Sequence, residues 1–216
     1  MMKIKPFVFN DFAVNSFVIY DDSNDCVIVD PGCVTKSEQE QLSQFIKDNN
    51  LKPVKLINTH CHVDHVAGNK FVVDTYQIPV YANENDKENL LNAKRAGELY
   101  GMQIDTPPEV NHYLNQDDVL TFGKSTLKVM HLPGHSKGSI AVYAEAEKFV
   151  VVGDVIFNGS IGRTDLLGGS LDELMNSIKS RLFKLDDDVT VYSGHGPETT
   201  IGNEVRSNPF LLDNVL

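Results

Sequence analysis

Four strand-like runs of this chain end in a histidine or an aspartate, and this feature constrains the fold more than any other. Each run is short and rich in β-branched residues, which favour strands. The runs are Val54–Ile57 before His60, Leu127–Met130 before His135, Val150–Val152 before Asp154, and Val189–Tyr192 before His195. Because α/β proteins build their sites at strand ends, we expect these four ends to meet in one site.

The remaining pattern is that of a mixed α and β protein, with short apolar runs separated by polar or glycine-rich loops and helical segments. No Pro/Ser-rich linker or low-complexity tract interrupts it. The predicted strands are Ile4–Phe9, Phe17–Tyr20, Cys26–Val29, Val54–Ile57, Pro79–Tyr81, Leu127–His131, Ile140–Tyr143, Phe149–Val152 and Val189–Tyr192.

Two amphipathic helices are predicted from their capping residues. Thr35 and Glu38 form one capping-box pattern, and Ser170 and Glu173 form a second. The apolar stripes that follow are Leu42, Phe45 and Ile46 in the first helix, and Leu174, Met175, Ile178 and Leu182 in the second. A third helical region, Asn83 to Tyr100, is polar and charged, which predicts a surface element or a lid.

Composition limits the possible partners. The chain has 216 residues, 41% of them hydrophobic, which is enough for one domain with a large core, residues 1–216, made of two packed halves. The formal charge of -11 and the pI near 5.0 disfavour nucleic acid and anionic membranes, because both bind clustered Lys and Arg.

The three cysteines, Cys26, Cys33 and Cys61, are too few for a disulfide framework and suit a reducing cytoplasm. The N-terminal residues contain no signal-peptide h-region, and no run approaches the roughly 18 apolar residues of a membrane span. We therefore expect a soluble, cytoplasmic protein.

The segment His60–His65 has the composition of a metal site. It contains His60, His62, Asp64 and His65, more donors than one tetrahedral ion accepts when a water position stays open. Two adjacent divalent ions are predicted, with zinc favoured and iron or manganese also suited to nitrogen and oxygen donors. The two histidines away from such strand ends, His112 and His131, are expected to be ordinary polar residues.

These motifs resemble the metallo-β-lactamase superfamily over nearly the whole chain. The matching motifs are Thr59–His65 (T-H-x-H-x-D-H), Pro133-Gly134-His135, Gly153-Asp154, Gly194-His195-Gly196 and Asp30-Pro31-Gly32. The resemblance implies an α+β fold, an αβ/βα four-layer sandwich of two mixed sheets flanked by helices. Its metals would lie at one edge, between two similar halves of roughly residues 1–105 and 106–216.

The resemblance also assigns metal ligands. The first metal would take His60, His62 and His135, the second Asp64, His65 and His195, and Asp154 would bridge both. Two such cations lower the pKa of a shared water and polarise a substrate oxygen. Asp64 is the predicted catalytic residue, because it can both ligate a metal and orient the attacking hydroxide.

Two nearby residues have alternative roles. A ligating imidazole normally donates its second N–H to a carboxylate or carbonyl, and Asp30 is the candidate partner; otherwise Asp30 only forms the Asp-Pro-Gly turn. Cys61 lies between two ligands, and we expect a small packing residue rather than a ligand.

A second resemblance narrows the subfamily. Gly162-Arg163-Thr164-Asp165 is similar to a stretch found in small glyoxalase II-like hydrolases and in persulfide dioxygenases, and the closing segment from Thr199 to Phe210 looks like the ending of the former. Arg163 would either bind an anionic substrate group or, as we favour, pair with Asp165.

The chain departs from typical glyoxalase II enzymes in the region that recognises the thiol part of the substrate. Typical glyoxalase II enzymes carry a long C-terminal extension that binds glutathione, whereas only 21 residues follow His195 here. Lys137 and Tyr143 are the candidates to bind a substrate carboxylate in its place; the alternative is an exposed lysine and a core tyrosine.

The resulting prediction is a binuclear metal-dependent hydrolase of a thioester or related ester. The alternatives are a mononuclear iron persulfide dioxygenase, with His62, His135 and Asp154 as the implied ligands, and a lactonase or β-lactamase that opens a ring. Two other activities of the superfamily are disfavoured. Its nucleases need a basic surface, which this acidic chain lacks, and its flavin-linked di-iron members replace one motif histidine by glutamate, a replacement that does not occur here. A metal-stabilised interaction module is the non-catalytic alternative.

Overall fold

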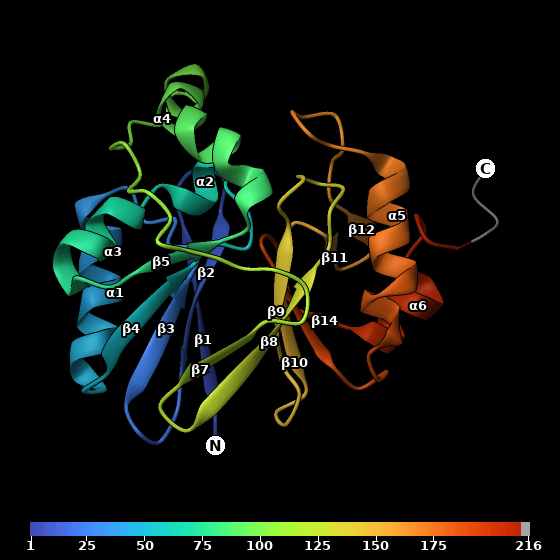
Figure 1. Ribbon diagram of the computed structural model, residues 1–216, viewed down its shortest axis with the longest axis horizontal. Coiled ribbons are helices and arrows are strands. Elements are labelled where there is room, and N and C mark those ends of the chain that lie inside the picture. Colours follow the sequence, from blue (N-terminus) through green and yellow to red (C-terminus); the bar gives the residue numbers. More distant parts are fainter. Residues whose placement is uncertain (213–216) are drawn as a thin grey trace.

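The fold is described from a computed structural model, in which residues 1–212 are described. Within this range the main strands form two six-stranded mixed sheets that face each other, and helices cover both outer faces (Figure 1). This is the predicted four-layer αβ/βα sandwich. Among the same residues, no helix has the length and apolarity needed to cross a membrane.

The first sheet belongs to the N-terminal half. In spatial order its strands are β1 (Lys3–Phe9), β2 (Val14–Tyr20), β3 (Asp25–Val29), β4 (Lys52–Ile57), β5 (Val80–Ala82) and β6 (His112–Tyr113). β1, β2 and β3 are antiparallel neighbours, whereas β3 to β6 run parallel. The parallel strands β3 and β4 therefore deliver Asp30 and His60 to the same end of the sheet.

The second sheet belongs to the C-terminal half. In spatial order it contains β14 (Thr199–Thr200), β13 (Thr190–Ser193), β10 (Phe149–Gly153), β9 (Ile140–Ala144), β8 (Ser125–His131) and β7 (Val119–Phe122). β10 and β13 are parallel, so that Asp154 and His195 also follow strands at one end. A small hairpin of β11 (Ile156–Phe157) and β12 (Ser160–Ile161) comes next after Asp154.

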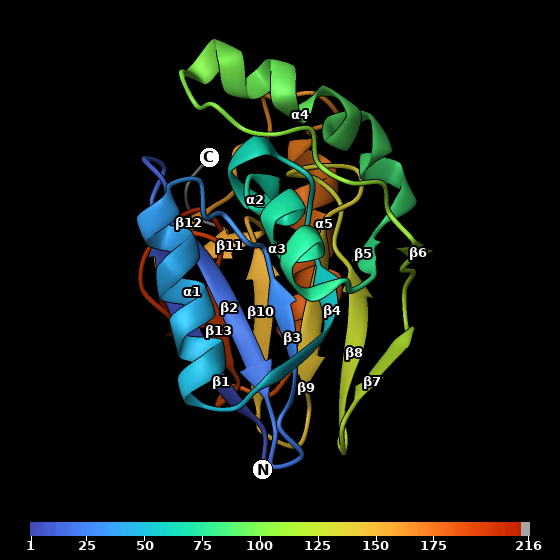
Figure 2. The ribbon, with the colours of Figure 1, turned by 90° about the vertical axis from the view of Figure 1, so that its left-hand side faces the viewer.

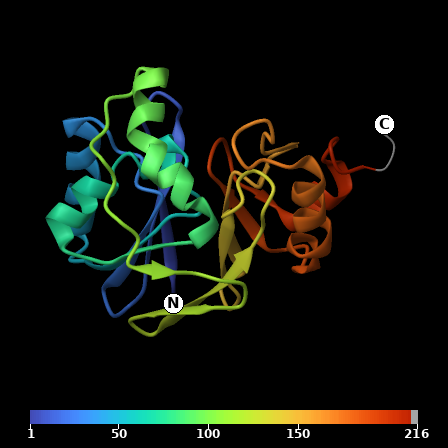
Figure 3. The ribbon, with the colours of Figure 1, turned by 45° about the horizontal axis from the view of Figure 1, so that its top comes forward.

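The helices cover the two outer faces, as two perpendicular views show (Figures 1 and 2). On the first sheet lie α1 (Lys36–Asp48), α2 (Val63–Val66) and α3 (Asn69–Tyr76); on the second lie α5 (Leu171–Ser180) and α6 (Ile201–Ser207). The remaining helix, α4 (Lys87–Tyr100), follows a short 3-10 turn at Glu84–Asp86 and crosses the top of the first half (Figure 3).

Strand alternation creates the core layers. In β2, Phe17 and Ile19 enter the core between the sheets, while Val18 packs toward the helices of the first half. In β10, Val151 faces the same central core and Val150 faces the helices of the second half. Because successive side chains of a strand point to opposite faces, both faces of these strands are apolar and buried.

All nine predicted strands are confirmed, with ends shifted by a few residues. The capping box at Thr35 is present in full, but at Ser170 only the serine half is described, with the Glu173 amide donating to Ser170 Oγ. The second predicted stripe also runs too far, because α5 ends at Ser180 and Leu182 lies in a 3-10 turn beyond it.

The boundary between the halves lies later than the predicted position near residue 105. The first sheet takes its last strand, β6, from His112–Tyr113, and the second begins at Val119. Within residues 1–212 the predicted single domain therefore has one sheet in each half; its last four residues lie outside the described range.

Candidate metal centre

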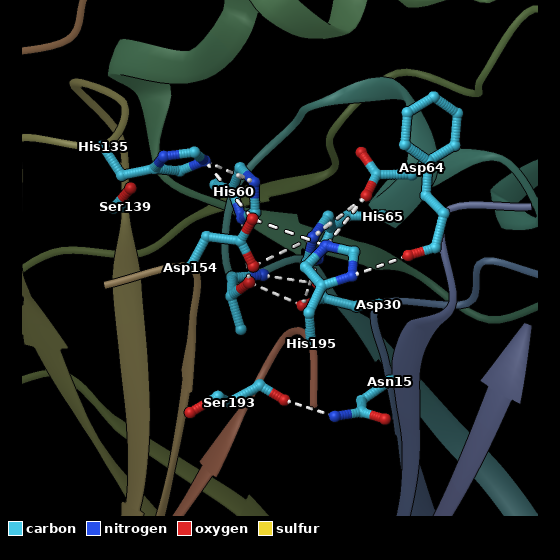
Figure 4. A network of polar contacts seen from close by, with 12 residues as sticks. Asn15, Asp30, His60, Asp64, His65, His135, Ser139, Asp154, Ser193 and His195 are labelled. Atoms are coloured by element: carbon cyan, nitrogen blue, oxygen red, sulfur yellow. Dashed lines mark hydrogen bonds and ion pairs between the residues drawn. The ribbon is translucent and has the colours of Figure 1, made fainter. Parts of the chain in front are cut away.

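Seven histidine and aspartate side chains converge where strands of both sheets end. They come from the loops after β4, β8, β10 and β13, and Figure 4 shows six of them. The residues are His60, His62, Asp64, His65, His135, Asp154 and His195. These are the seven residues that the sequence motifs predicted as ligands. Residues 135 positions apart, His60 and His195, meet here because both sheets present their strand ends to the same side.

One group of three histidines lies on one side of the cluster. A ligand atom from each of His60, His62 and His135 lies within 4.8 Å of the others. The Nε2 atoms of His60 and His135 are 3.2 Å apart, and the rings of His62 and His135 are 4.6 Å apart. Three imidazoles this close match the set predicted for the first metal.

A second group lies beside it and contains Asp64, His65 and His195, again with donor atoms within 4.8 Å of one another. Asp64 Oδ2 is 3.2 Å from His195 Nε2 and 3.5 Å from His65 Nε2. Nitrogen and carboxylate oxygen donors in this number suit zinc, iron or manganese.

Asp154 lies between the two groups. Its Oδ1 atom is 3.3 Å from His65 Nε2, and its Oδ2 atom is 3.5 Å from His195 Nε2 and 3.6 Å from His135 Nε2. One carboxylate that reaches both groups is the geometry expected of a bridging ligand.

Four of the five clustered histidines have their Nδ1 atom held by an oxygen. The pairs are His60 with Thr59 Oγ1 (3.2 Å), His65 with Asp30 Oδ2 (3.0 Å), His135 with the Arg163 carbonyl (2.8 Å) and His195 with the Phe12 carbonyl (3.0 Å). Because carbonyl and carboxylate oxygens only accept, each such ring carries its proton on Nδ1 when neutral, and its Nε2 lone pair is free for a metal.

Thr59 fixes the tautomer of His60 by the same logic. Its hydroxyl has one hydrogen, which it donates to Asp30 Oδ2 at 2.5 Å, so that toward His60 the hydroxyl oxygen can only accept. His60 and His135 then both direct an Nε2 lone pair toward the other across 3.2 Å. Two acceptors that face each other at this distance repel, and a cation between them removes the repulsion.

Two buried atoms at the centre of the cluster, 3.3 Å apart, are also without a hydrogen bond within residues 1–212. Among the described residues, His65 Nε2 and Asp154 Oδ1 form no hydrogen bond. A buried polar atom without a partner costs free energy, and native structures contain few of them. The orphaned atoms and the donor set therefore both fit divalent metal ions at this position.

Burial and charge shift the pKa values of the clustered residues in different directions. Burial lowers the pKa of His60 well below 6.5 and that of His62 to about 4, so both rings are neutral donors at pH 7. Burial would also lower the pKa of His65, but the carboxylates of Asp64 and Asp154 raise it well above 6.5. Burial opposes ionisation of Asp64, yet its histidine neighbours hold its pKa below 3.8.

Asp30 lies directly behind the cluster, where the sequence placed it. It is fully buried, and besides the contact with His65 it accepts hydrogen bonds from the amide and hydroxyl of Thr59. Its φ of +48° is unusual for a residue other than glycine. A strained backbone that is kept at a site usually serves the site's geometry, and here it directs one carboxylate toward two neighbours of the metal position.

Glycine is required beside the carboxylate of Asp154. A Cβ atom at Gly194 would lie 2.1 Å from Asp154 Oδ1 and 2.7 Å from His65 Cε1. The loop is also held from the other half, because Asn15 Nδ2 donates to the carbonyls of Ser193 and Gly196 at 2.9 and 2.8 Å (Figure 4 shows the Ser193 bond). Both devices fix the position of His195.

Asp86, which the sequence did not identify, ties two ligand loops together. It is fully buried at the start of α4 and accepts hydrogen bonds from the Cys61 amide, the Gly138 amide and the Ser136 hydroxyl at 2.8 to 2.9 Å. Cys61 lies between His60 and His62, and Ser136 follows His135. One carboxylate therefore joins the loops that carry all three histidines of the first group.

A cleft of about 550 Å³ opens onto the clustered histidines and aspartates. The described residues that line it include α4 on one side and the β11–β12 hairpin with the loop after it on the other. The predicted surface element, residues 83–100, thus forms one wall. Ligand pockets typically have volumes of this order.

The three predicted substrate residues fall in different places. Arg163 lines the cleft, but its guanidinium forms two hydrogen bonds to Asp165, at 2.7 and 2.8 Å, as we favoured. Tyr143 lies away from the cleft, in a groove on the outer face of the second sheet, because its position in β9 points toward α5. Lys137 is exposed and is not among the described residues lining the cleft.

The remaining candidates behave as packing or ordinary polar residues. Cys61 is buried against Val66 and Leu90, and burial raises the pKa of its thiol well above 9.0. His112 stacks on Tyr81 and His131 contacts the Lys137 carbonyl, both away from the cluster.

Comparison with known families agrees with this geometry. The model of the Metallo-beta-lactamase superfamily matches residues 9–195. The curated hydroxyacylglutathione hydrolase GloC of Haemophilus influenzae is 34% identical over 212 residues, which cover 97% of this chain and 98% of that protein.

Two solved structures resemble the whole chain. BLEG-1 B3 metallo-beta-lactamase is 38% identical with a TM-score of 0.89, covering 97% of this chain and 100% of that chain. TTHA1623, solved in a di-iron-bound form, is 34% identical with a TM-score of 0.87, covering 96% of this chain and 100% of that chain.

Proposed function

This chain belongs to the metallo-beta-lactamase superfamily, and on that premise we propose that it is a binuclear metal-dependent hydrolase that cleaves a thioester. The carrying observation is the arrangement of seven ligands in two adjacent groups, with Asp154 between them and the Nε2 lone pairs of His60 and His135 facing each other.

Two divalent ions fit the donor set, with zinc as the favoured metal. The similarity to TTHA1623, solved with two irons, supports two metals and keeps iron as an alternative. When bound, such a pair supplies a water of lowered pKa and polarises the substrate carbonyl oxygen. The second group, Asp64, His65 and His195, would have no ligand role in a mononuclear dioxygenase, which favours the binuclear hydrolase.

The chain's own residues would complete the reaction. Asp64 lines the cleft and is ionised at pH 7, since its histidine neighbours lower its pKa, so it can accept a hydrogen bond from the attacking water and orient it. Asp30, Thr59 and the backbone carbonyls hold the imidazoles in one tautomer. No cysteine nucleophile takes part, because burial keeps the thiol of Cys61 protonated.

The thioester assignment rests on the full-length similarity to GloC, whose name states that it hydrolyses hydroxyacylglutathione. A second candidate reaction, opening of a β-lactam ring, is favoured by the similarity to BLEG-1. Both reactions need an activated water and stabilisation of an oxyanion. The cytoplasmic location and the absence of nucleic-acid and membrane partners remain predictions.

The proposal is tested by activity of the zinc-loaded and the iron-loaded protein toward acyl thioesters and a chromogenic cephalosporin. We expect thioester cleavage, and Asp64→Asn should lower kcat/KM by about 100-fold or more, while circular dichroism shows an intact fold. Asp74→Asn, in an exposed pair with Lys70, is the matched control. Efficient cephalosporin cleavage without thioester cleavage would replace this assignment by the second candidate.

A further inference from the structure

The walls of the substrate cleft are mostly apolar where they leave the metal ligands. Phe12, Tyr100 and Leu167 line the cleft and are 41%, 54% and 60% exposed. Phe157 lines it beside His195, with the two ring centres 6.2 Å apart. Large apolar side chains that gather at a site without being buried by the fold mark a surface that binds something apolar.

Two of these side chains form a preformed wall. The rings of Phe12 and Tyr100 meet edge to face at 5.8 Å, which joins the β1–β2 turn to the end of α4. Ala93 and Ala96 continue this wall along the same helix. Aromatic pairs in this geometry gain about 0.5 to 1.5 kcal/mol beyond their buried area, so the wall is held in place before a substrate binds.

The charges around the cleft point the same way. Among the described residues that line it, Arg163 is the single Lys or Arg, and its guanidinium is already paired with Asp165. The other charged lining residues are the carboxylates of Asp64 and Asp154. Apart from the metal ions of the proposed function, an anionic group bound in this cleft would meet no unpaired Lys or Arg among the described lining residues. It would also lie in the field of a chain of net charge -11.

We infer that the substrate is a thioester of an apolar acyl group, a medium-length alkyl or aromatic chain, on a thiol without carboxylates near the sulfur. This inference rests on the proposed thioester hydrolysis and specifies its substrate class. The acyl group lies against the apolar walls, with the reacting carbonyl at the metal ligands. Glutathione, which carries two carboxylates and one ammonium group, fits this cleft poorly.

The test crosses two acyl groups with two thiols. Acetyl and hexanoyl thioesters of N-acetylcysteamine and of glutathione are assayed with the zinc-loaded protein. Each methylene buried against the apolar wall can raise kcat/KM by up to about fourfold. We therefore expect kcat/KM for the hexanoyl thioester to exceed that for the acetyl thioester by roughly tenfold or more. The N-acetylcysteamine thioesters should be preferred over those of glutathione.

Variants of the wall provide the specific control. Tyr100→Ser and Leu167→Ser should each reduce the ratio of hexanoyl to acetyl kcat/KM to about fourfold or less, which is the value of a single methylene. Leu99→Ser is the matched control, because Leu99 is the neighbour of Tyr100 on α4, is 79% exposed and is not among the described lining residues. This variant should keep the wild-type preference.

The two proposals fail in different ways. Equal rates for both acyl groups, or a preference for glutathione thioesters, would overturn the apolar cleft and leave thioester hydrolysis intact. If no thioester is cleaved, the proposed function fails. Calorimetry then tests separately whether the cleft binds apolar acyl chains. Hexanoate should then bind the zinc-loaded protein more tightly than acetate, with Tyr100→Ser removing the difference; equal binding would sink the inference.

Discussion

At the scale of the residue, the site is a set of imidazoles whose protons are placed by their neighbours. Asp30 and Thr59 do this for His65 and His60, and main-chain carbonyls do it for His135 and His195. The candidate ligands could be predicted because His and Asp cluster in a recognisable spacing. The main-chain partners of His195 and His135 could not be predicted, because every residue has a backbone carbonyl and residue type does not mark those of Phe12 and Arg163.

The role of Asp86 could not be predicted from the sequence either. It lies in a polar run, Asn83–Asp86, that reads like any solvated turn, and only the folded chain shows that its carboxylate is fully buried between two ligand loops. Asp86→Asn should place an amide N–H against a backbone N–H donor and leave a buried hydrogen bond unmade. We expect a loss of about 2 to 4 kcal/mol in unfolding free energy and of about 10- to 100-fold in zinc affinity.

These losses are measured by thermal unfolding and by competition with a chromophoric chelator. Glu88→Gln, an exposed acidic residue two positions further along the helix, is the matched control and should change neither quantity. Wild-type zinc affinity in Asp86→Asn would show that this carboxylate does not position the metal loops.

At the scale of the element, the strands and helices that could be predicted are those marked by a local pattern of apolar or capping residues. The longer strands were predictable because they are short apolar runs rich in β-branched residues, and α1 because its first turn is a capping box. The elements not predicted include β6, β11, β12 and β14 with two residues each, β7 and α2 with four, and the helices α6 and α3 with seven and eight. The two-residue strands are too short to show a periodic pattern, and β6 forms only by pairing with the distant β5.

The cap of α1 gives a prediction at this scale. Thr35 Oγ1 accepts from the Glu38 amide, while the Glu38 carboxylate accepts from the Thr35 and Asn10 amides at 2.7 and 2.6 Å. Thr35→Ala should lower the unfolding free energy by about 1 kcal/mol, measured by urea denaturation, with kcat unchanged. Lys36→Ala serves as the control at an exposed position; an equal loss in both variants would argue against a capping role.

At the scale of the whole molecule, two halves must stay in register for one site to form. Asn15 links them near the metals, and Asp21 links them at the opposite end. Asp21 is buried and accepts from the Ser23 and Lys124 amides at 2.8 and 2.7 Å and from the hydroxyls of Ser23 and Ser125. It therefore joins the β2–β3 turn to the β7–β8 turn.

This link makes stability depend on pH. Burial alone would raise the pKa of Asp21, but its hydrogen bonds lower it to about 2 from 3.8. A lowered folded-state pKa gives stability that is complete above pH 4 and is lost as the pH falls toward 2. The unfolding free energy of wild type minus Asp21→Asn should thus lose about 2 kcal/mol between pH 5 and pH 2.

Urea denaturation across this pH range checks the prediction. Asp11→Asn is the matched control, because Asp11 is an exposed aspartate in the β1–β2 turn, away from the contact between the two halves that Asp21 makes. A difference for Asp21→Asn that stays constant with pH would show that the ionised carboxylate is not what stabilises the contact between the halves.

The central claim is a site for two metal ions, and metal content per chain tests it most directly. Protein purified anaerobically, then saturated with zinc or iron and freed of excess, is analysed for metals beside the His195→Ala variant, which lacks a ligand of the second group only. We predict close to two ions per wild-type chain and close to one in the variant. A single ion in the wild-type chain under saturating metal would contradict the account.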